Sequence, residues 1–229
     1  AAAWALDRAQ PGIRTLVVER AATVGAGSSR ASLENFRTCW PCAPLARMMQ
    51  RSVHVIMNAD EYLGEGAHDA LHPKQQGYLW CAFTEAQAAG FRADIAHLRG
   101  MGIDVVDYLD ADEVSHRFPW LGGRVIAAKY DATAGWLDSN ALISRFLSAA
   151  AGAQVLLDAG DTRLRIESGR ITGVETAAGF VAAQRIVLAA GAWSVEIARA
   201  AQIALPITLR PRQSFTTGWR HDAFPDDAP

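Results

Sequence analysis

A carboxylate directly follows a short apolar run near the start of the chain. Leu16, Val17 and Val18 form the apolar run, and Glu19 is the acid that ends it. In dinucleotide-binding folds a parallel strand ends in this way, and its carboxylate accepts hydrogen bonds from the hydroxyl groups of the adenosine ribose. An ordinary buried strand that happens to end in glutamate is the alternative for this residue taken alone.

The residues on both sides of this acid favour the first interpretation. The loop after it contains Gly-Ala-Gly-Ser-Ser-Arg-Ala-Ser at residues 25–32, which is small, hydroxylated and basic, as expected of a loop beside a pyrophosphate. Before it, residues 1–10 are mostly strong helix formers and Pro11-Gly12 ends the run. A helix, a turn and a strand that ends in an acid form the second half of a βαβ unit. Because the glycine-rich turn of the first half is absent, we expect an internal piece of a longer protein.

The composition is that of a soluble globular enzyme. Of the 229 residues, 50% are hydrophobic and 20% are charged, and the net charge of −2 gives no electrostatic case for binding nucleic acid or an anionic membrane surface. No apolar run is long enough to span a bilayer. The three cysteines are too few for a disulfide scaffold, and they predict a reducing, cytoplasmic compartment.

Hydrophobic periodicity and turn residues predict an alternation of helices and strands. The predicted helices are 1–10, 44–64, 84–100, a short one from Asp110 that Pro119 ends, one from Asp138 or Ser139 to 151, and 194–201. The predicted strands are 16–18, 77–83, 103–109, 125–130, 154–157, a hairpin of 164–166 with 171–176, an edge at 180–182, an apolar strand at 186–190, and a final strand at 205–215. Residues 65–76 and 221–229 are expected to be loops.

In this order, these landmarks resemble the FAD-dependent amine and amino-acid oxidoreductases. That family includes D-amino-acid oxidase, glycine oxidase, sarcosine oxidase and dimethylglycine dehydrogenase. The motifs that carry the resemblance are residues 17–20 (Val-Val-Glu-Arg), 27–32, 135–138 (Gly-Trp-Leu-Asp), 169–174 and 187–194 (Val-Leu-Ala-Ala-Gly-Ala-Trp-Ser).

The resemblance implies an α/β fold with two domains. Residues 1–65 and 135–203 would form a Rossmann-like FAD-binding domain with a mainly parallel sheet. Residues 66–134 and 204–229 would form an inserted α+β substrate domain with a mixed or antiparallel sheet. By the family pattern, both the N-terminal glycine turn and the C-terminal portion that completes the flavin site lie outside this sequence.

The resemblance also assigns cofactor-binding residues. Glu19 would hold the adenosine ribose with Arg20 beside it, and Arg37 would lie near the flavin or the substrate carboxylate. The backbone at Asp161 would recognise adenine. The pyrophosphate and the adenosine side would be lined by Ser28, Ser29, Arg30, Ala31, Ser32, Ala190, Gly191 and Trp193. Solvated loop charge is the alternative role for Arg30 and Arg37, and a plain core role is the alternative for Trp193. No metal site is expected, and the sequence indicates no catalytic acid or base.

The implied activity is oxidation of a C–N bond in an amino acid or in a secondary or tertiary amine, by hydride transfer to flavin. The electron acceptor, oxygen or another, stays open. Two other classes of function are also open. Cys39 and Cys42 form a CxxC pair, which is typical of thiol-disulfide oxidoreductases. A Rossmann-like binding or assembly module without chemistry is the other, because fold alone does not establish activity.

Overall fold

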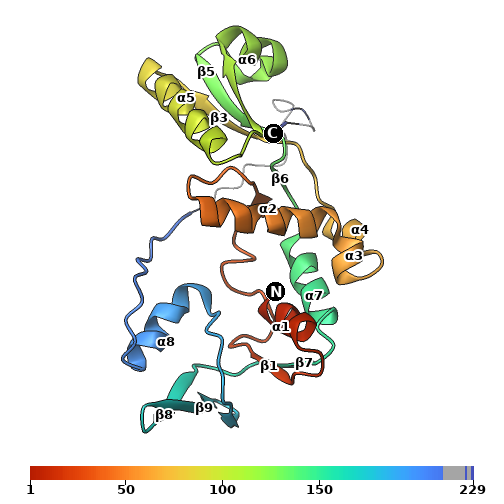
Figure 1. Ribbon diagram of the computed structural model, residues 1–229, viewed down its shortest axis with the longest axis vertical. Coiled ribbons are helices and arrows are strands. Elements are labelled where there is room, and N and C mark those ends of the chain that lie inside the picture. The colour runs from red at the N-terminus through yellow and green to blue at the C-terminus, as the bar shows by residue number, and fades with distance from the viewer. Residues whose placement is uncertain (214–224, 226–227) are drawn as a thin grey trace. The chain divides into compact units, whose positions relative to one another are not determined.

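The chain forms two compact units in the computed structural model, which describes residues 1–213, 225 and 228–229 (Figure 1). Unit 1 comprises Ala1–Ser32 and Ser139–Ser214, and unit 2 comprises Leu33–Asp138 and Phe215–Pro229. These bounds differ from those of the expected domains: residues 33–65 and 135–138 belong to unit 2, and residues 204–213 belong to unit 1. Helices and sheets are both present, consistent with an α/β fold.

Unit 1 is built on a pair of parallel strands. Helix α1 (Ala2–Ala9) leads to β1 (Thr15–Val18), and helix α7 (Ser139–Ser148) leads to β7 (Ala153–Leu156). The two strands pair in parallel, with Thr15 opposite Ala153. The helices contact each other through Trp4 and Phe146, whose rings meet edge to face with centroids 5.2 Å apart. The predicted helix–strand order is confirmed, although the parallel sheet has only these two strands in the described part of the chain.

An antiparallel meander follows the parallel pair in unit 1. Strands β8 (Arg163–Glu167), β9 (Arg170–Thr176) and β10 (Gly179–Ala182) are neighbours in the order β10-β9-β8. The predicted hairpin is therefore confirmed. Its turn uses Ser168 and Gly169, both with positive φ (50° and 74°), as tight antiparallel connections require.

Two predicted strands are absent from the described residues. The apolar run at 186–190 forms no strand, and Val187 in its middle is 61% exposed. A strand requires a neighbour whose backbone groups are aligned with it, and no described segment supplies one here. The short helix η2 (Gly191–Trp193) and helix α8 (Ser194–Ala200) come next, as predicted for 194–201. Residues 205–213 also form no strand, and Ser214 and Phe215 lie outside the described residues.

Unit 2 is built on a three-stranded antiparallel sheet with a helix against each face (Figure 1). The strands are β3 (Tyr78–Ala82), β4 (Val106–Asp110) and β5 (Ala127–Asp131), in the order β3-β5-β4. Helix α5 (Glu85–Gly100) packs its Ile95 and Leu98 in one cluster with Val106 and Trp80. Helix α6 (Ala111–Arg117), followed by η1 (Pro119–Leu121), packs Val114 in another cluster with Leu109 and Ala128. The predicted strands and helices of this region are confirmed.

Local capping explains why both helices begin where the sequence predicts. The Thr84 hydroxyl accepts a hydrogen bond from the Gln87 backbone N–H at 3.3 Å. Asp110 and Glu113 form a reciprocal capping box, with distances of 2.9 and 3.1 Å. Both arrangements satisfy N–H groups that have no partner inside the helix.

The prediction of one continuous helix over residues 44–64 is wrong, because the helix is interrupted at residue 58. Helix α2 (Ala43–Met57) ends at Asn58, and α3 (Ala59–Leu63) begins after it. The Asn58 amide donates to the backbone carbonyl of His54 at 2.8 Å, and its backbone leaves the helical region (φ −116°, ψ 39°). Asparagine competes with the helix for backbone hydrogen bonds in this way. The expected loop 65–76 likewise contains a short helix, α4 (Ala67–Leu71).

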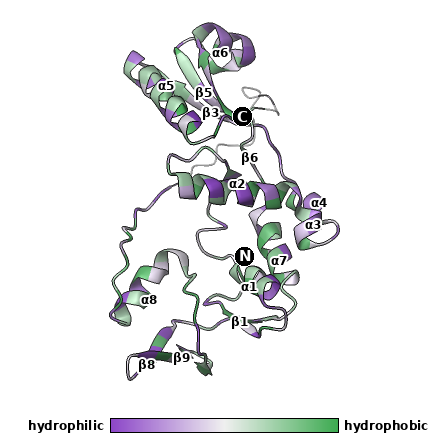
Figure 2. Ribbon diagram, viewed as in Figure 1, coloured by the Kyte–Doolittle hydropathy of each residue, from purple (hydrophilic) through white to green (hydrophobic). Residues whose placement is uncertain are grey.

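A second small sheet joins the two ends of the 33–138 segment of unit 2. Strand β2 (Asn35–Phe36) pairs with β6 (Gly135–Trp136), and Lys74 forms an isolated bridge to Trp136. Figure 2 shows hydrophilic and hydrophobic residues on the same turns of α2, which buries Ala46, Val53 and Ile56. Among the described residues, no helix has both the length and the apolar character needed to cross a bilayer.

Candidate functional site

The carboxyl ends of the two parallel strands in unit 1 lie at the same edge and continue side by side beyond the strands. The Glu19 N–H donates to the Leu156 carbonyl at 2.9 Å, and the Ala159 N–H donates to the Glu19 carbonyl at 3.0 Å. In open α/β sheets, ligands bind at this edge. Glu19, the first predicted cofactor residue, therefore lies at the carboxyl edge of this strand pair.

The Glu19 side chain is half-buried and only partly used by the protein. One carboxylate oxygen, Oε1, accepts a hydrogen bond from the Ala21 backbone N–H at 2.9 Å. That bond orients the carboxylate, and Oε2 has no hydrogen-bond partner within the described part of the chain. A half-buried, oriented oxygen with no partner fits a ligand hydroxyl group, and it is this observation that makes the site compatible with an adenosine ribose.

Three predicted residues that are far apart in sequence meet next to Glu19. The Arg20 guanidinium lies over the Trp193 ring, 5.0 Å from its centroid, and its Nη1 is 3.7 Å from Asp161 Oδ1. Because both charged side chains are more than half exposed, the ion pair itself contributes little stability. A Cβ on Gly27 would lie 3.4 Å from the Trp193 ring, so the small-residue loop passes close to the indole.

The loop at 25–32 is anchored by its backbone and exposes its side chains. The hydroxyls of Ser32 and Ser139 both donate to the Ser29 carbonyl, at 3.1 and 3.3 Å. Gly25 has φ of 76°, in the left-handed region that favours glycine, and a Cβ there would displace the end of the Ile143 side chain. The predicted pyrophosphate residues Ser28, Ser29, Arg30, Ala31 and Ser32 are all exposed.

Ala190 and Gly191, two further predicted cofactor residues of unit 1, form the turn that leads to Trp193. The Trp193 N–H donates to the Ala190 carbonyl at 3.1 Å, and Gly191 has φ of 56°. Trp193 is 40% exposed, so it is a surface platform instead of a core residue.

Arg37 belongs to unit 2, where aromatic rings surround it. Its guanidinium carbon lies 4.3 Å from the ring centroid of Trp40, 5.4 Å from that of Tyr78 and 5.8 Å from that of Trp80. The side chain is half-buried, and none of the described acidic residues forms an ion pair with it. Such a cation is positioned by π-faces while its N–H groups stay available to an anion.

Sequence reasoning missed a buried polar cluster beside this arginine. Asp131 is completely buried at the end of β5, and its Oδ1 accepts hydrogen bonds from the backbone N–H and the hydroxyl of Thr133, at 3.0 and 2.7 Å. Thr38 is buried nearby, with its Oγ1 3.3 Å from Thr133 Oγ1. The Asp-Ala-Thr order after a strand, which is typical of an Asx turn, is the signal that could have found it.

The CxxC pair lacks the properties of a redox dithiol. Cys39 is buried and Cys42 is exposed. Burial and the nearby Asp131 carboxylate raise the pKa of the Cys39 thiol to about 12. Thiol-disulfide exchange requires a lowered pKa on the attacking thiol, so this geometry disfavours the thiol-disulfide alternative.

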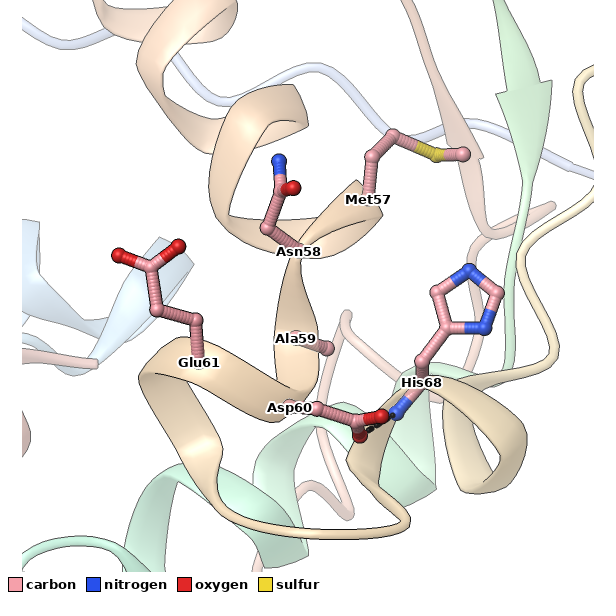
Figure 3. A pocket seen from close by; sticks show the side chains of 6 residues that line it. All are labelled: Met57, Asn58, Ala59, Asp60, Glu61 and His68. Carbon is pink, nitrogen blue, oxygen red and sulfur yellow. Dashed lines mark hydrogen bonds between the residues drawn. The ribbon is translucent and has the colours of Figure 1, made fainter.

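A surface hollow of about 330 Å³ lies in unit 2 where α2, α3 and α4 meet (Figure 3). It is lined by Met57, Asn58, Ala59, Asp60, Glu61 and His68. The Asp60 carboxylate is already used, because its Oδ1 accepts a hydrogen bond from the His68 backbone N–H at 2.8 Å. The Glu61 carboxylate points away from Asp60 (Figure 3). Among the described residues no cluster of three metal-ligating side chains occurs, and none of the predicted site residues lines this hollow.

Curated relatives of this chain are, by their names, oxidoreductases of amines and amino acids. The chain is 29% identical over 158 residues to the sarcosine oxidase subunit beta of Rhizobium meliloti, covering 62% of this chain and 36% of that protein. It is 31% identical over 148 residues to a D-amino acid dehydrogenase of Cereibacter sphaeroides, covering 60% of this chain and 33% of that protein. The chain thus spans about a third of the length of these relatives.

Solved structures share the fold. L-proline dehydrogenase from P. horikoshii superimposes with a TM-score of 0.74 at 26% identity, covering 88% of this chain and 52% of that one. Glycine oxidase from Geobacillus kaustophilus gives a TM-score of 0.75 at 23% identity, with 89% and 55% covered. The resemblance inferred from the motifs is confirmed by the family profile, which matches residues 1–228. The chain therefore belongs to the FAD dependent oxidoreductase (DAO) family, whose cofactor is FAD.

Proposed function

We propose that this chain is part of an enzyme that oxidises a C–N bond of an amino acid or of a secondary or tertiary amine. When bound, FAD supplies the hydride acceptor for this chemistry. The relatives act on sarcosine, D-amino acids, glycine and L-proline by their names, which are all small amines with a carboxylate. The observation that carries the proposal is the oriented Glu19 carboxylate at the carboxyl edge of β1 and β7.

In this proposal unit 1 holds the cofactor. Glu19 Oε2 accepts a hydrogen bond from a ribose hydroxyl, and Arg20 and Trp193 form a flat cationic and aromatic surface beside it. Backbone groups near Asp161, together with Ala190 and Gly191, line the adenosine side. The exposed residues Ser28, Ser29, Arg30, Ala31 and Ser32 follow the pyrophosphate, where hydroxyl and guanidinium groups suit phosphate oxygens.

Unit 2 meets the substrate in this proposal. Arg37 binds the substrate carboxylate, because a guanidinium offers two parallel N–H donors to a carboxylate and no described acid competes for them. In this proposal the substrate-binding part of the chain begins near residue 33, where unit 2 begins. No described residue is assigned as a catalytic acid or base.

The test is the visible spectrum of the full-length protein that contains this sequence. We expect flavin absorbance that bleaches under anaerobic conditions when sarcosine, glycine, a D-amino acid or L-proline is added. A protein that stays colourless with excess FAD would overturn the proposal and favour a binding module without chemistry.

A variant pair links this readout to the site. Glu19→Gln removes the charge but keeps the size, and we expect FAD binding to weaken about 10-fold, because a hydrogen bond to a charged group contributes ~1.5 kcal/mol or more. Glu167→Gln, at the exposed end of β8 in the same unit, is the matched control and should bind FAD like the parent protein. Equal FAD affinity in the parent and in Glu19→Gln would contradict the assigned role.

A further inference from the structure

Aromatic rings hold the guanidinium group of Arg37. A buried polar network holds the backbone that follows Arg37 in sequence. The rings of Trp40, Tyr78 and Trp80 contact the side chain. The two residues that follow Arg37 in sequence, Thr38 and Cys39, are only 7% and 8% exposed. Buried polar groups require hydrogen-bond partners, so the contacts of these two residues decide where the segment can lie.

Thr38 is joined to the end of β5 through Thr133. The Thr133 hydroxyl has a single proton, and it donates that proton to Asp131 Oδ1 at 2.7 Å. In the 3.3 Å contact between the two threonine hydroxyls, Thr38 must therefore be the donor and Thr133 the acceptor. The result is a directed chain of hydrogen bonds from Thr38 through Thr133 to the buried carboxylate.

Cys39 lies near the same carboxylate. Asp131 is 0% exposed, and its Oδ2 has no hydrogen-bond partner among the described residues. Burial and this nearby carboxylate raise the pKa of the Cys39 thiol, while the charges of Arg37 and Lys129 act in the opposite direction. A buried carboxylate is costly unless its surroundings compensate it, so its presence at this place calls for a role.

We propose that Asp131 and Thr133 are positioning residues that hold the Thr38–Cys39 segment and thereby orient Arg37 toward the carboxylate of the substrate. They act through the backbone beside Arg37 and do not touch the substrate themselves. This inference rests on the proposed role of Arg37 in carboxylate binding.

The experiment compares Thr133→Val with Thr133→Ser in the FAD-loaded full-length protein. Valine has nearly the shape of threonine and lacks the hydroxyl, whereas serine keeps it. With an amino-acid substrate, we expect Thr133→Val to raise KM about 5-fold, as the loss of one hydrogen bond predicts, and to change kcat less than 2-fold. Thr133→Ser should restore the parent KM. Thr172→Val, which removes a half-buried hydroxyl bonded to the Arg165 carbonyl in unit 1, is the matched control.

A second readout does not depend on turnover. Acetate is the probe, and the fluorescence of the tryptophans next to Arg37 reports its binding. We expect Thr133→Val and Thr38→Val each to weaken acetate binding about 5-fold, and Arg37→Gln to abolish it. In the Arg37→Gln background, adding Thr133→Val should change nothing further, because the two residues act on the same step.

The outcomes separate the inference from the proposed function. Acetate affinity that is unchanged in both valine variants, or an acetate response that survives Arg37→Gln, overturns the positioning role whatever the flavin does. Absence of bleaching by every amine tested overturns the proposed function, and the acetate titration then still decides whether Asp131 and Thr133 orient Arg37.

Discussion

Replacing Gly135 by alanine should destabilise unit 2, because backbone atoms occupy the space that a side chain would need. A Cβ at this position would lie 1.9 Å from the Lys74 carbonyl oxygen and 2.8 Å from its carbonyl carbon. Gly135 also pairs with Phe36 in the small sheet that precedes Arg37. Since no flexible side chain can move to make room, the bridge between Lys74 and Trp136 has to open.

The magnitude follows from the hydrogen bonds in that bridge. Lys74 and Trp136 exchange two backbone hydrogen bonds, at 2.9 and 3.0 Å. At a net ~0.5–1.5 kcal/mol for each, their loss lowers the free energy of unfolding by about 1–3 kcal/mol. For a chain of this size each kcal/mol lowers the melting temperature by about 2–4 °C.

Thermal melting followed by far-UV circular dichroism measures the effect. Gly123→Ala is the matched control, because a Cβ there would meet no atom within 4 Å and its φ is not positive. We expect the control to melt within about 2 °C of the parent protein, since surface changes of this kind stay within ~0.5 kcal/mol. If Gly135→Ala and Gly123→Ala melt at the same temperature, the steric reasoning is refuted.

Three further results are expected. Burial and the nearby Asp131 carboxylate raise the pKa of Cys39 to about 12, so a thiol reagent at pH 8 should label the exposed Cys42 quickly and Cys39 only on unfolding. The folded state also loses stability as pH rises from 9 toward 12, and Cys39→Ser should flatten that loss in alkaline denaturation curves. Thr84→Ala removes the cap of α5 and should lower the free energy of unfolding in urea by about 1 kcal/mol, whereas an unchanged midpoint would show that the cap is not used. Leu71→Ala empties a completely buried site and should cost about 2–5 kcal/mol in the same assay, and a cost below that of the Thr84 variant would contradict the burial.

Sequence patterns that span only a few residues, such as helix caps and turns, predicted the local structure well. The starts of α5 and α6 follow from Thr84 and Asp110, whose side chains bond to N–H groups three residues later. The β8–β9 hairpin follows from its turn residues in the same way. The break at Asn58 was missed because helical periodicity continues across it, whereas the backbone dihedrals of Asn58 and its side-chain bond to His54 show that the helix ends there.

Features that depend on distant partners could not be predicted from local sequence patterns alone. The run at 186–190 has the apolar character of a buried strand, yet strand formation depends on a neighbour, which periodicity does not reveal. The family resemblance grouped Arg20, Asp161 and Trp193 around one cofactor, and the structure brings those three together. The sequence does not distinguish Asp131 from an ordinary acid after a strand, because its complete burial depends on packing with segments that are distant in sequence.

The interruption of unit 1 by residues 33–138 has a consequence for synthesis on the ribosome. Thr15 cannot find its parallel partner Ala153 until the whole intervening stretch has been translated. Every strand of the β3-β5-β4 sheet, in contrast, leaves the exit tunnel before β7 does. Because domains generally fold as units while the chain emerges, the inserted sheet can close first, and β1 must wait for its parallel partner β7.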